Sequence, residues 1–175
     1  MEKDRLKRWS AASRVFIKVE FQLTFLSQGL GRLDVTLLKH DAEIVGQRKQ
    51  YGNMRVVEFG DSLILSYLWV LGAYELVRVI NQRAHSKKVD PFYKTRFPEI
   101  GSVKKLFERI RIPLAKLEAS NRNRQTDFKI AIPIFNFEMQ STAWVVAPNV
   151  AISRRDLADK LLAVLEQASS GKASA

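Results

Sequence analysis

Apolar residues at three- and four-residue spacing run from Phe16 to Tyr51, and this pattern constrains the fold more than any other feature of the sequence. Its members are Phe16, Val19, Leu23, Leu26, Leu30, Leu33, Leu37, Ile44 and Tyr51, with His40 and Gln47 at the two interrupted positions. This spacing places side chains on one face of an α-helix. Residues 15–25 also alternate with period two, as a strand would, but the helical pattern continues where the alternation stops. The sequence therefore predicts one long helix over 16–51.

A second segment, residues 63–84, is apolar on nearly every side, which is typical of a helix at the centre of a bundle. Asp61 or Ser62 is suited to cap its N-terminus. The segment nearly reaches membrane-spanning length, but it contains Glu75 and Arg78, and each would be costly in hydrocarbon. We therefore expect a buried central helix and no insertion into a membrane.

A third helix is predicted over 103–117, capped by Ser102, with apolar residues in one arc and basic residues in the opposite arc. Pro113 must kink this helix or begin a new segment, because proline lacks a backbone N–H and clashes with the preceding turn. The stretch between the second and third helices, residues 85–101, contains two prolines and a closing glycine, so it is predicted to be a loop.

The last third of the chain adds strand patterns before a final helix. Residues 128–137 alternate with period two, with Pro133 expected on an edge strand, and residues 141–147 are rich in β-formers. Ser153 and Asp156, three residues apart, have the spacing of a capping box at a helix start. A small β-hairpin followed by a C-terminal helix is predicted.

These patterns together predict a mainly α (α+β) fold. We expect a helical bundle with a long N-terminal helix and a small β-hairpin before the C-terminal helix. A chain of 175 residues is long enough to bury a core as one domain. The predicted domain covers 1–168, and residues 169–175 are predicted to be a disordered tail.

The chain has no cysteine, which excludes disulfides, thiolate metal sites and a cysteine nucleophile, and which favours a cytoplasmic protein. Its two histidines, His40 and His85, would need help from Asp41 or Glu43 to bind a metal, and they lack the paired spacing of such sites. Glycine-rich phosphate loops and nucleophile elbows are also missing from the sequence. We therefore expect no metal and no cofactor.

The net charge of +11 is concentrated in two blocks. Residues 1–14 carry five basic and two acidic side chains, and residues 83–129 carry thirteen basic and five acidic ones, while the rest of the chain is balanced. A localised basic excess favours a polyanionic or acidic partner, although a solvated surface is the alternative. The predicted nucleic-acid-binding residues are Lys104, Lys105, Arg109, Arg111 and Lys116 on a helix face, and Arg122 and Arg124 in the following loop.

The leading hypothesis is a non-catalytic basic binding module that contacts nucleic-acid phosphates or an acidic protein, alone or as a subunit of a larger intracellular assembly. Such cations act through charge and bind without sequence specificity. Phe92, Tyr93 and Phe97 lie inside the basic block and are suited to stack on bases, but packing in the core is the favoured role.

The octet RVINQRAH, residues 78–85, raises an enzymatic alternative. Glu75, Arg78, Gln82 and His85 fall within an arc of about 80° on the second helix, surrounded by apolar positions. One interpretation is a structural polar seam in which Glu75 pairs with Arg78 and His85 lies near the helix end. That interpretation is the one we favour.

The other interpretation rests on a resemblance. Arg78 followed by His85 resembles the arginine–histidine signature of HEPN ribonucleases, a family of helical bundles. The resemblance implies that Arg78 would hold the scissile phosphate, His85 would handle the proton of the 2′-hydroxyl, and the site would form across a homodimer without a metal. Glu75 would orient the arginine. Val79 departs from the pattern, because the family usually has a polar residue after the arginine.

A third class of function is a structural or regulatory oligomer. The apolar stripe over 16–51 is wide enough to pack within one chain but also regular enough to pair two copies, and a helix this long tends to outrun a small domain. We therefore expect a homodimer.

Overall fold

The computed structural model describes residues 2–51, 56–86 and 91–171. Within these ranges the predicted mainly α (α+β) fold is confirmed: the chain is a helical bundle with a small antiparallel sheet before its C-terminal helix. The elements are α1 (Glu2–Ser13), η1 (Arg14–Phe16), α2 (Phe21–Tyr51), α3 (Val56–His85), α4 (Pro91–Arg96), α5 (Ile100–Lys116), η2 (Asn121–Asn123), β1 (Ile132–Asn136), β2 (Ser141–Ala147), β3 (Val150–Ser153) and α6 (Arg154–Ser170).

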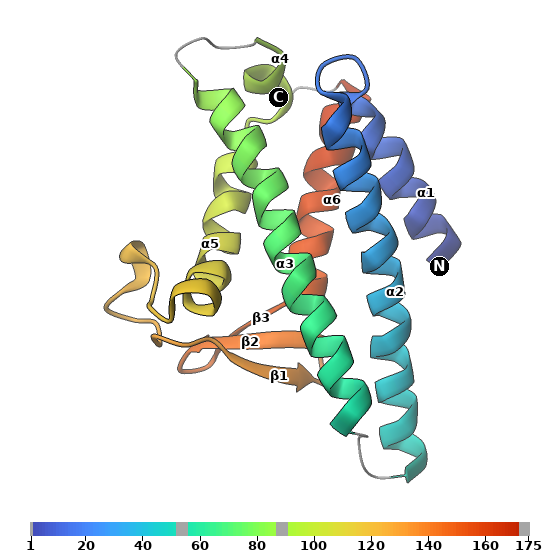
Figure 1. Ribbon diagram of the computed structural model, residues 1–175, viewed down its shortest axis with the longest axis vertical. Coiled ribbons are helices and arrows are strands. Elements are labelled where there is room, and N and C mark those ends of the chain that lie inside the picture. The colour runs from blue at the N-terminus through green and yellow to red at the C-terminus, as the bar shows by residue number, and fades with distance from the viewer. Residues whose placement is uncertain (1, 52–55, 87–90, 172–175) are drawn as a thin grey trace.

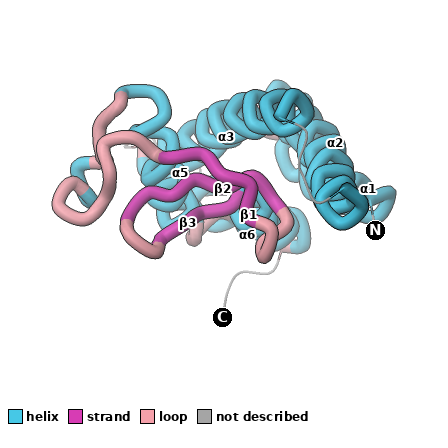
Figure 2. The backbone as a smooth tube through the Cα atoms, turned by 90° about the horizontal axis from the view of Figure 1, so that it is seen from below, coloured by secondary structure: helices cyan, strands magenta, loops and turns pink. Residues whose placement is uncertain are grey.

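The two long helices, α2 and α3, run antiparallel and pack against each other (Figure 1). Helix α1 packs on α2 and α6, and α5 packs on the other side of α3. The sheet lies beside the lower half of α3 and just below the lower end of α6 (Figure 1). Seen from below, α3 lies at the margin of the molecule and the sheet lies beneath it (Figure 2).

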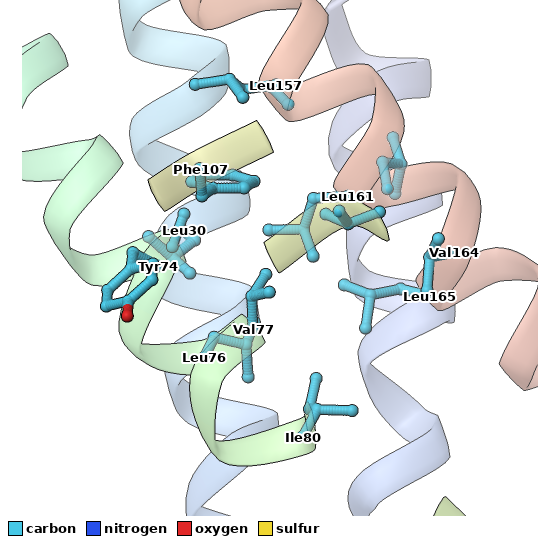
Figure 3. Close-up of a cluster of buried hydrophobic side chains, with 14 of the residues drawn as sticks. Leu30, Tyr74, Leu76, Val77, Ile80, Phe107, Leu157, Leu161, Val164 and Leu165 are labelled. Atoms are coloured by element: carbon cyan, nitrogen blue, oxygen red, sulfur yellow. The ribbon is translucent and has the colours of Figure 1, made fainter. Parts of the chain in front are cut away.

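The hydrophobic core forms where the inner faces of four helices meet. Leu30 of α2, Ile80 of α3, Phe107 of α5 and Leu161 of α6 all point into it (Figure 3). Ile80, Phe107 and Leu161 are completely buried and Leu30 nearly so. Within each helix the buried apolar residues recur at helical spacing in the sequence. Each helix therefore presents an apolar face to the others.

The predicted long helix begins later than expected. Helix α2 starts at Phe21, and the preceding residues form η1 and a turn in which the Glu20 N–H donates to the Phe16 carbonyl at 2.9 Å. A short helix, α1, precedes both, so the long helix is the second one. The middle of the stripe packs within the chain: Leu23, Leu37 and Ile44 are buried in the bundle, whereas Val19 is 39% exposed.

Helix α3 differs from the prediction in two ways. It begins at Val56, so Asp61 and Ser62 lie inside the helix and do not cap it. It is also not central, because its outer face is open to solvent, with Ile64 60% and Leu68 52% exposed. Among the described residues, the part of α3 from Phe59 to His85 is the one stretch that meets the length and apolarity of a membrane-crossing helix, a criterion that core helices of bundles also meet. The pattern of apolar residues did not predict the position of α3 in the bundle, because this helix is apolar on both its inner and its outer face.

The predicted loop after α3 contains a short helix, α4, whose Tyr93 is buried. Residues 87–90 of this predicted loop lie outside the described residues. Helix α5 begins at Ile100, before the expected cap, and Ser102 donates its hydroxyl to the Glu99 carbonyl at 2.8 Å from within the helix. Pro113 lies inside α5, which continues to Lys116.

The predicted hairpin is two strands of a three-stranded sheet in the order β1–β2–β3. Pro133 lies in the edge strand β1, as predicted, where its missing N–H costs least. The predicted cap of α6 is also confirmed, since the Asp156 N–H donates to the Ser153 hydroxyl at 3.0 Å. Helix α6 extends to Ser170, and residues 172–175 of the predicted tail lie outside the described residues.

Candidate anion-binding surface

The cations predicted on α5 are in part engaged by carboxylates of the same chain. Lys104 Nζ lies 2.5 Å from Glu108 Oε1, one helical turn further along. Arg109 donates two hydrogen bonds to Asp127, at 2.7 and 2.8 Å, and the Asp127 side chain is only 1% exposed. Lys104 and Arg109 therefore have internal partners and are not free to neutralise an external anion.

The pair between Arg109 and Asp127 fixes the loop that follows α5. The hydrogen bonds to Asp127 raise the pKa of Arg109 and outweigh the opposing effect of burial. The Asp127 N–H donates to the Asn123 carbonyl at 2.8 Å, which continues the turn begun by η2. The loop is consequently held against α5 at a defined place.

Arg111, Lys116 and Arg124 occupy different environments. The Arg111 guanidinium lies over the Tyr74 ring, 5.2 Å from its centre, and is half-buried. Lys116 Nζ lies 4.0 Å from Glu118 Oε1, and both side chains are about half exposed, so this pair contributes little. Arg124 is exposed in the loop and forms no ion pair within the described residues.

Lys105 and Arg122 converge on one hollow, although they belong to different elements. This hollow, which we call the α5–η2 hollow, has a volume of about 280 Å³. Its lining is mostly polar and consists of Lys105, Glu108 and Ile112 from α5 and Ser120, Asn121, Arg122 and Asn123 from the loop. Neither cation forms an ion pair with any residue that the structure describes.

The loop residues 120–123, which line one side of the hollow, are held in place by hydrogen bonds within the loop. The Ser120 hydroxyl donates to Asn123 Oδ1 at 3.0 Å, and the Asn123 N–H donates to the Ser120 carbonyl at 2.9 Å. Because the side-chain oxygen Oδ1 of Asn123 accepts this hydrogen bond, the side-chain nitrogen Nδ2 of Asn123 is left as a donor. The carboxylate of Glu108 is neutralised by Lys104, so the hollow keeps the positive charge of Lys105 and Arg122.

The polar residues Arg78, Gln82 and His85 of the RVINQRAH octet lie on the exposed side of α3, whereas Ile80 and Ala84 are buried. Arg78 donates to Glu75 at 2.7 Å and to Gln82 at 3.0 Å. His85 is the last residue of α3, and its Nδ1 lies 2.9 Å from the Asn81 carbonyl oxygen. The local pairing expected of a structural seam is present, but the seam is not buried, since Arg78 is 37% and Glu75 46% exposed.

The two histidines do not meet. His40 of α2 lies beside Asp61 of α3 at a small hollow that Glu43 also lines. His85 is 24 residues further along α3, which corresponds to about 36 Å of helix. Among the described residues, moreover, no group of three or more histidines and carboxylates is placed to hold a metal ion.

Sequence reasoning missed a buried ionic cluster between α2 and α6. Arg154 donates to Asp34 at 2.6 Å and to Asp41 at 2.7 Å, and all three side chains are completely buried. Asp34 also accepts hydrogen bonds from Arg5 at 2.5 Å and from the Trp9 indole at 3.0 Å. The available signal was the spacing of the two aspartates, seven residues apart beside the apolar stripe of α2.

Arg5 connects this cluster to the surface, because it also contacts Asp159 of α6 at 2.5 Å. Burial acts to lower the pKa of Arg5, but its bonds to Asp34 and Asp159 outweigh burial and raise it. Arg8 pairs with Glu166 of α6 at 2.7 Å. Two of the basic side chains of the N-terminal block therefore serve to dock α1 on α6.

Comparison with protein-family models, with curated proteins and with solved structures finds no match to this chain.

Proposed function

We propose that the protein is a non-catalytic binding module that contacts nucleic-acid phosphates through Lys105, Arg122 and Arg124. One observation carries the proposal: Lys105 of α5 and Arg122 of η2 line the same polar hollow, and neither is neutralised by a carboxylate of the described chain. A phosphate group at this place would meet two cations and the amide donors of Asn121 and Asn123. Arg124 extends the same charge along the loop.

The arrangement favours contact with the nucleic-acid backbone over recognition of bases. Backbone contacts come from charged and amide donors and carry no sequence information directly. Stacking would need exposed aromatic rings near the cations, but Tyr93 and Phe97 are buried in the core and stack on each other, with ring centres 6.0 Å apart. We therefore expect similar affinity for different sequences and a strong dependence on salt.

A ribonuclease activity is less well supported by the geometry. Two donors of Arg78 are occupied by Glu75 and Gln82, whereas a catalytic arginine must offer its donors to a phosphate. The Glu75 carboxylate beside Arg78 also opposes the approach of an anion. These contacts support a structural role for the arginine.

The decisive test measures binding of labelled duplex DNA and RNA by fluorescence anisotropy at several salt concentrations. The double variant Lys105→Gln/Arg122→Gln is expected to bind more weakly, because two phosphate contacts are lost. The slope of log affinity against log salt should become shallower by about 0.9 per lost contact on a duplex. The matched control is Lys3→Gln/Lys7→Gln, which removes the same charge from exposed positions of α1.

A second variant tests whether a cation that is already paired with a carboxylate contributes to nucleic-acid binding. Lys104→Gln removes a lysine that Glu108 already neutralises, so we expect affinity and salt slope close to those of the wild type. The proposal is wrong if the wild type fails to bind in low salt, or if Lys105→Gln/Arg122→Gln leaves the slope unchanged. Retention of an acidic protein without any nucleic-acid binding would also contradict it.

A further inference from the structure

The α5–η2 hollow holds two positive charges that no carboxylate of the described chain cancels. They belong to Lys105 and Arg122, which reach the hollow from different elements. Glu108 also lines the hollow, but its carboxylate lies 2.5 Å from Lys104 Nζ, so this pair adds no net charge. The hollow therefore suits a ligand group that carries close to two negative charges.

The donors that line the hollow also exceed what one internal phosphate of a nucleic acid can accept. They are an ammonium, a guanidinium and the side-chain nitrogen of Asn123, to which Asn121 adds a second amide. An internal phosphodiester has a single negative charge and two oxygens that are not esterified. A terminal phosphomonoester carries about 1.5 to 2 negative charges at pH 7 and has three strong acceptor oxygens. The charge and the donors of the hollow match the monoester.

Beyond the hollow, unpaired positive charge continues along the loop. Arg124 lies two residues after Arg122, is exposed, and forms no ion pair within the described ranges. On α5, by contrast, the cations nearest to Lys105 in the sequence, Lys104 and Arg109, are each paired with a carboxylate. An internal stretch of a strand must leave a binding site in two directions, whereas a strand end leaves it in one. This distribution of charge favours a strand end.

The loop side of the hollow is held in place without a ligand. The Asn123 carbonyl accepts hydrogen bonds from the Thr126 N–H at 3.1 Å and the Asp127 N–H at 2.8 Å. Arg109 of α5 holds the Asp127 side chain through two further bonds. Binding therefore orders few groups, which keeps the entropic cost of association low. The loop projects from the bundle at the left of Figure 1, where a strand end can reach it.

We propose that the α5–η2 hollow binds the terminal phosphomonoester of a nucleic-acid strand, at its 5′ or its 3′ end. Lys105 neutralises the phosphate from α5 and Arg122 from the loop, and Asn123 donates to a further oxygen. The rest of the strand leaves along the loop, past Arg124. A volume of about 280 Å³ is near the lower limit of ligand pockets and suits the end of one strand. The inference rests on the proposed function, because it names the part of the nucleic acid that the same site prefers.

The first experiment compares strand ends in low salt. An internally labelled single strand with a 5′-phosphate is displaced by unlabelled strands of the same sequence, and fluorescence anisotropy follows the displacement. The competitors end in a 5′-phosphate, a 3′-phosphate, hydroxyls at both ends, or a 5′-phosphate blocked as its methyl ester. At least one phosphorylated strand is expected to bind about tenfold more tightly than the hydroxyl-ended strand, because it gains charge-assisted hydrogen bonds. The methyl ester is nearly the same size but has a single charge, so it should lose most of this preference.

The second experiment tests the hollow with substitutions of exposed side chains. Lys105→Gln and Arg122→Gln should each remove most of the preference for a phosphorylated end. Lys105→Arg keeps the charge and should keep the preference. Arg124→Gln should weaken the binding of all strands by a similar factor, because Arg124 contacts phosphates beyond the terminal one, so the ratio of affinities is retained. Circular dichroism of each variant establishes that the fold is unchanged.

The outcomes separate this inference from the proposed function. Equal affinity for phosphorylated and hydroxyl-ended strands overturns the inference alone, whereas failure of every strand to bind in low salt overturns the proposed function as well. A preference that persists in both Lys105→Gln and Arg122→Gln overturns the assignment to this hollow. Adenosine monophosphate and inorganic phosphate are further competitors. If either displaces the labelled strand as effectively as a phosphorylated strand does, the ligand is a free phosphate compound and the assignment to a strand end is overturned.

Discussion

Arg154 is a charged side chain with no exposure to water. Asp34 and Asp41 each accept one of its hydrogen bonds, and Asp34 is shared with Arg5 and Trp9. The desolvation of these groups is expensive, so the cluster is stable only while every member is present. Its effect on the molecule is to specify how α6 and α1 lie against α2.

Arg154→Leu is therefore expected to lower the free energy of unfolding by about 3–5 kcal/mol, because Asp41 loses the cation that it pairs with and Asp34 keeps only Arg5. Urea denaturation followed by circular dichroism measures this loss. Arg155→Leu is the control, since Arg155 is adjacent and forms no ion pair in the described part of the chain, and it should cost about 1 kcal/mol or less. Equal losses in the two variants would show that the ion pairs do not carry the stability.

Arg78 and His85 give a second prediction at this scale. The pair of Arg78 with Glu75 is exposed, so Arg78→Ala should cost about 1 kcal/mol or less. RNA incubated with the wild type in a metal chelator should remain as intact as with His85→Ala. Cleavage that disappears in His85→Ala but persists in Gln82→Ala would instead establish the catalytic role that the resemblance to HEPN ribonucleases implies.

At the scale of the elements, α1 approaches α2 closely at Gly31. A Cβ atom at this position would lie 2.5 Å from the Cβ of Trp9, which is completely buried. The Trp9 indole also donates to Asp34, one turn along α2. The glycine thus permits a contact that fixes α1 in place, at the cost of some helix propensity.

Gly31→Ala should lower the free energy of unfolding by about 1–3 kcal/mol, because α1 must move away from α2. Gly29→Ala, two residues earlier in the same helix, meets no atom within 4 Å and should raise stability by up to about 1 kcal/mol. Thermal denaturation of the two variants measures effects of opposite sign. The same sign in both would contradict the close packing of Trp9.

For the whole molecule, local patterns predicted most elements but not their neighbours. The three–four spacing of α2 and α5 identified helices, and the alternation around Pro133 identified an edge strand. Periodicity marks an apolar face without saying what covers it, so the open face of α3 was mistaken for core. Arg154 and Asp41 are 113 residues apart, and no local pattern reports such a contact.

The candidate site could be predicted in part. Counting charges located the basic block and named Lys105 and Arg122 among its members. It could not show that Lys104 and Arg109 are already paired, because Arg109 meets Asp127 only once the loop has turned back on α5. The hollow that joins Lys105 to Arg122 is likewise a property of the folded loop.

The end of the molecule that carries α4 should loosen in acid. Glu20, before α2, accepts hydrogen bonds from Arg83 of α3 and Tyr93 of α4, both at 2.9 Å. The bond to Arg83 is the main cause of a Glu20 pKa below the ordinary 4.5, opposed by burial and assisted by Tyr93. Because the pKa of Glu20 is lower in the folded protein than in the unfolded chain, its carboxylate contributes stability that is complete above pH 4.5. This contribution is lost as the pH falls through the pKa of Glu20 in the folded protein.

Glu20→Gln removes this dependence. Urea midpoints of the wild type and the variant should differ near neutral pH and converge in acid, because a protonated glutamate resembles glutamine. Glu138→Gln, in the exposed turn after β1, serves as the control. A difference that stays constant from neutral to acid pH would contradict the role of the Glu20 carboxylate.

The buried ionic cluster also orders events during synthesis. Asp34 and Asp41 leave the ribosome early. Arg5 is already present to pair with Asp34, but the cation that pairs with Asp41 is encoded more than a hundred residues later, at the first residue of α6. Until that residue emerges, the nascent α2 carries an acidic group without its cation on a face that is buried in the folded bundle. We therefore expect the bundle to close only after α6 has been made, and a chain interrupted before position 154 to keep this face of α2 open to water.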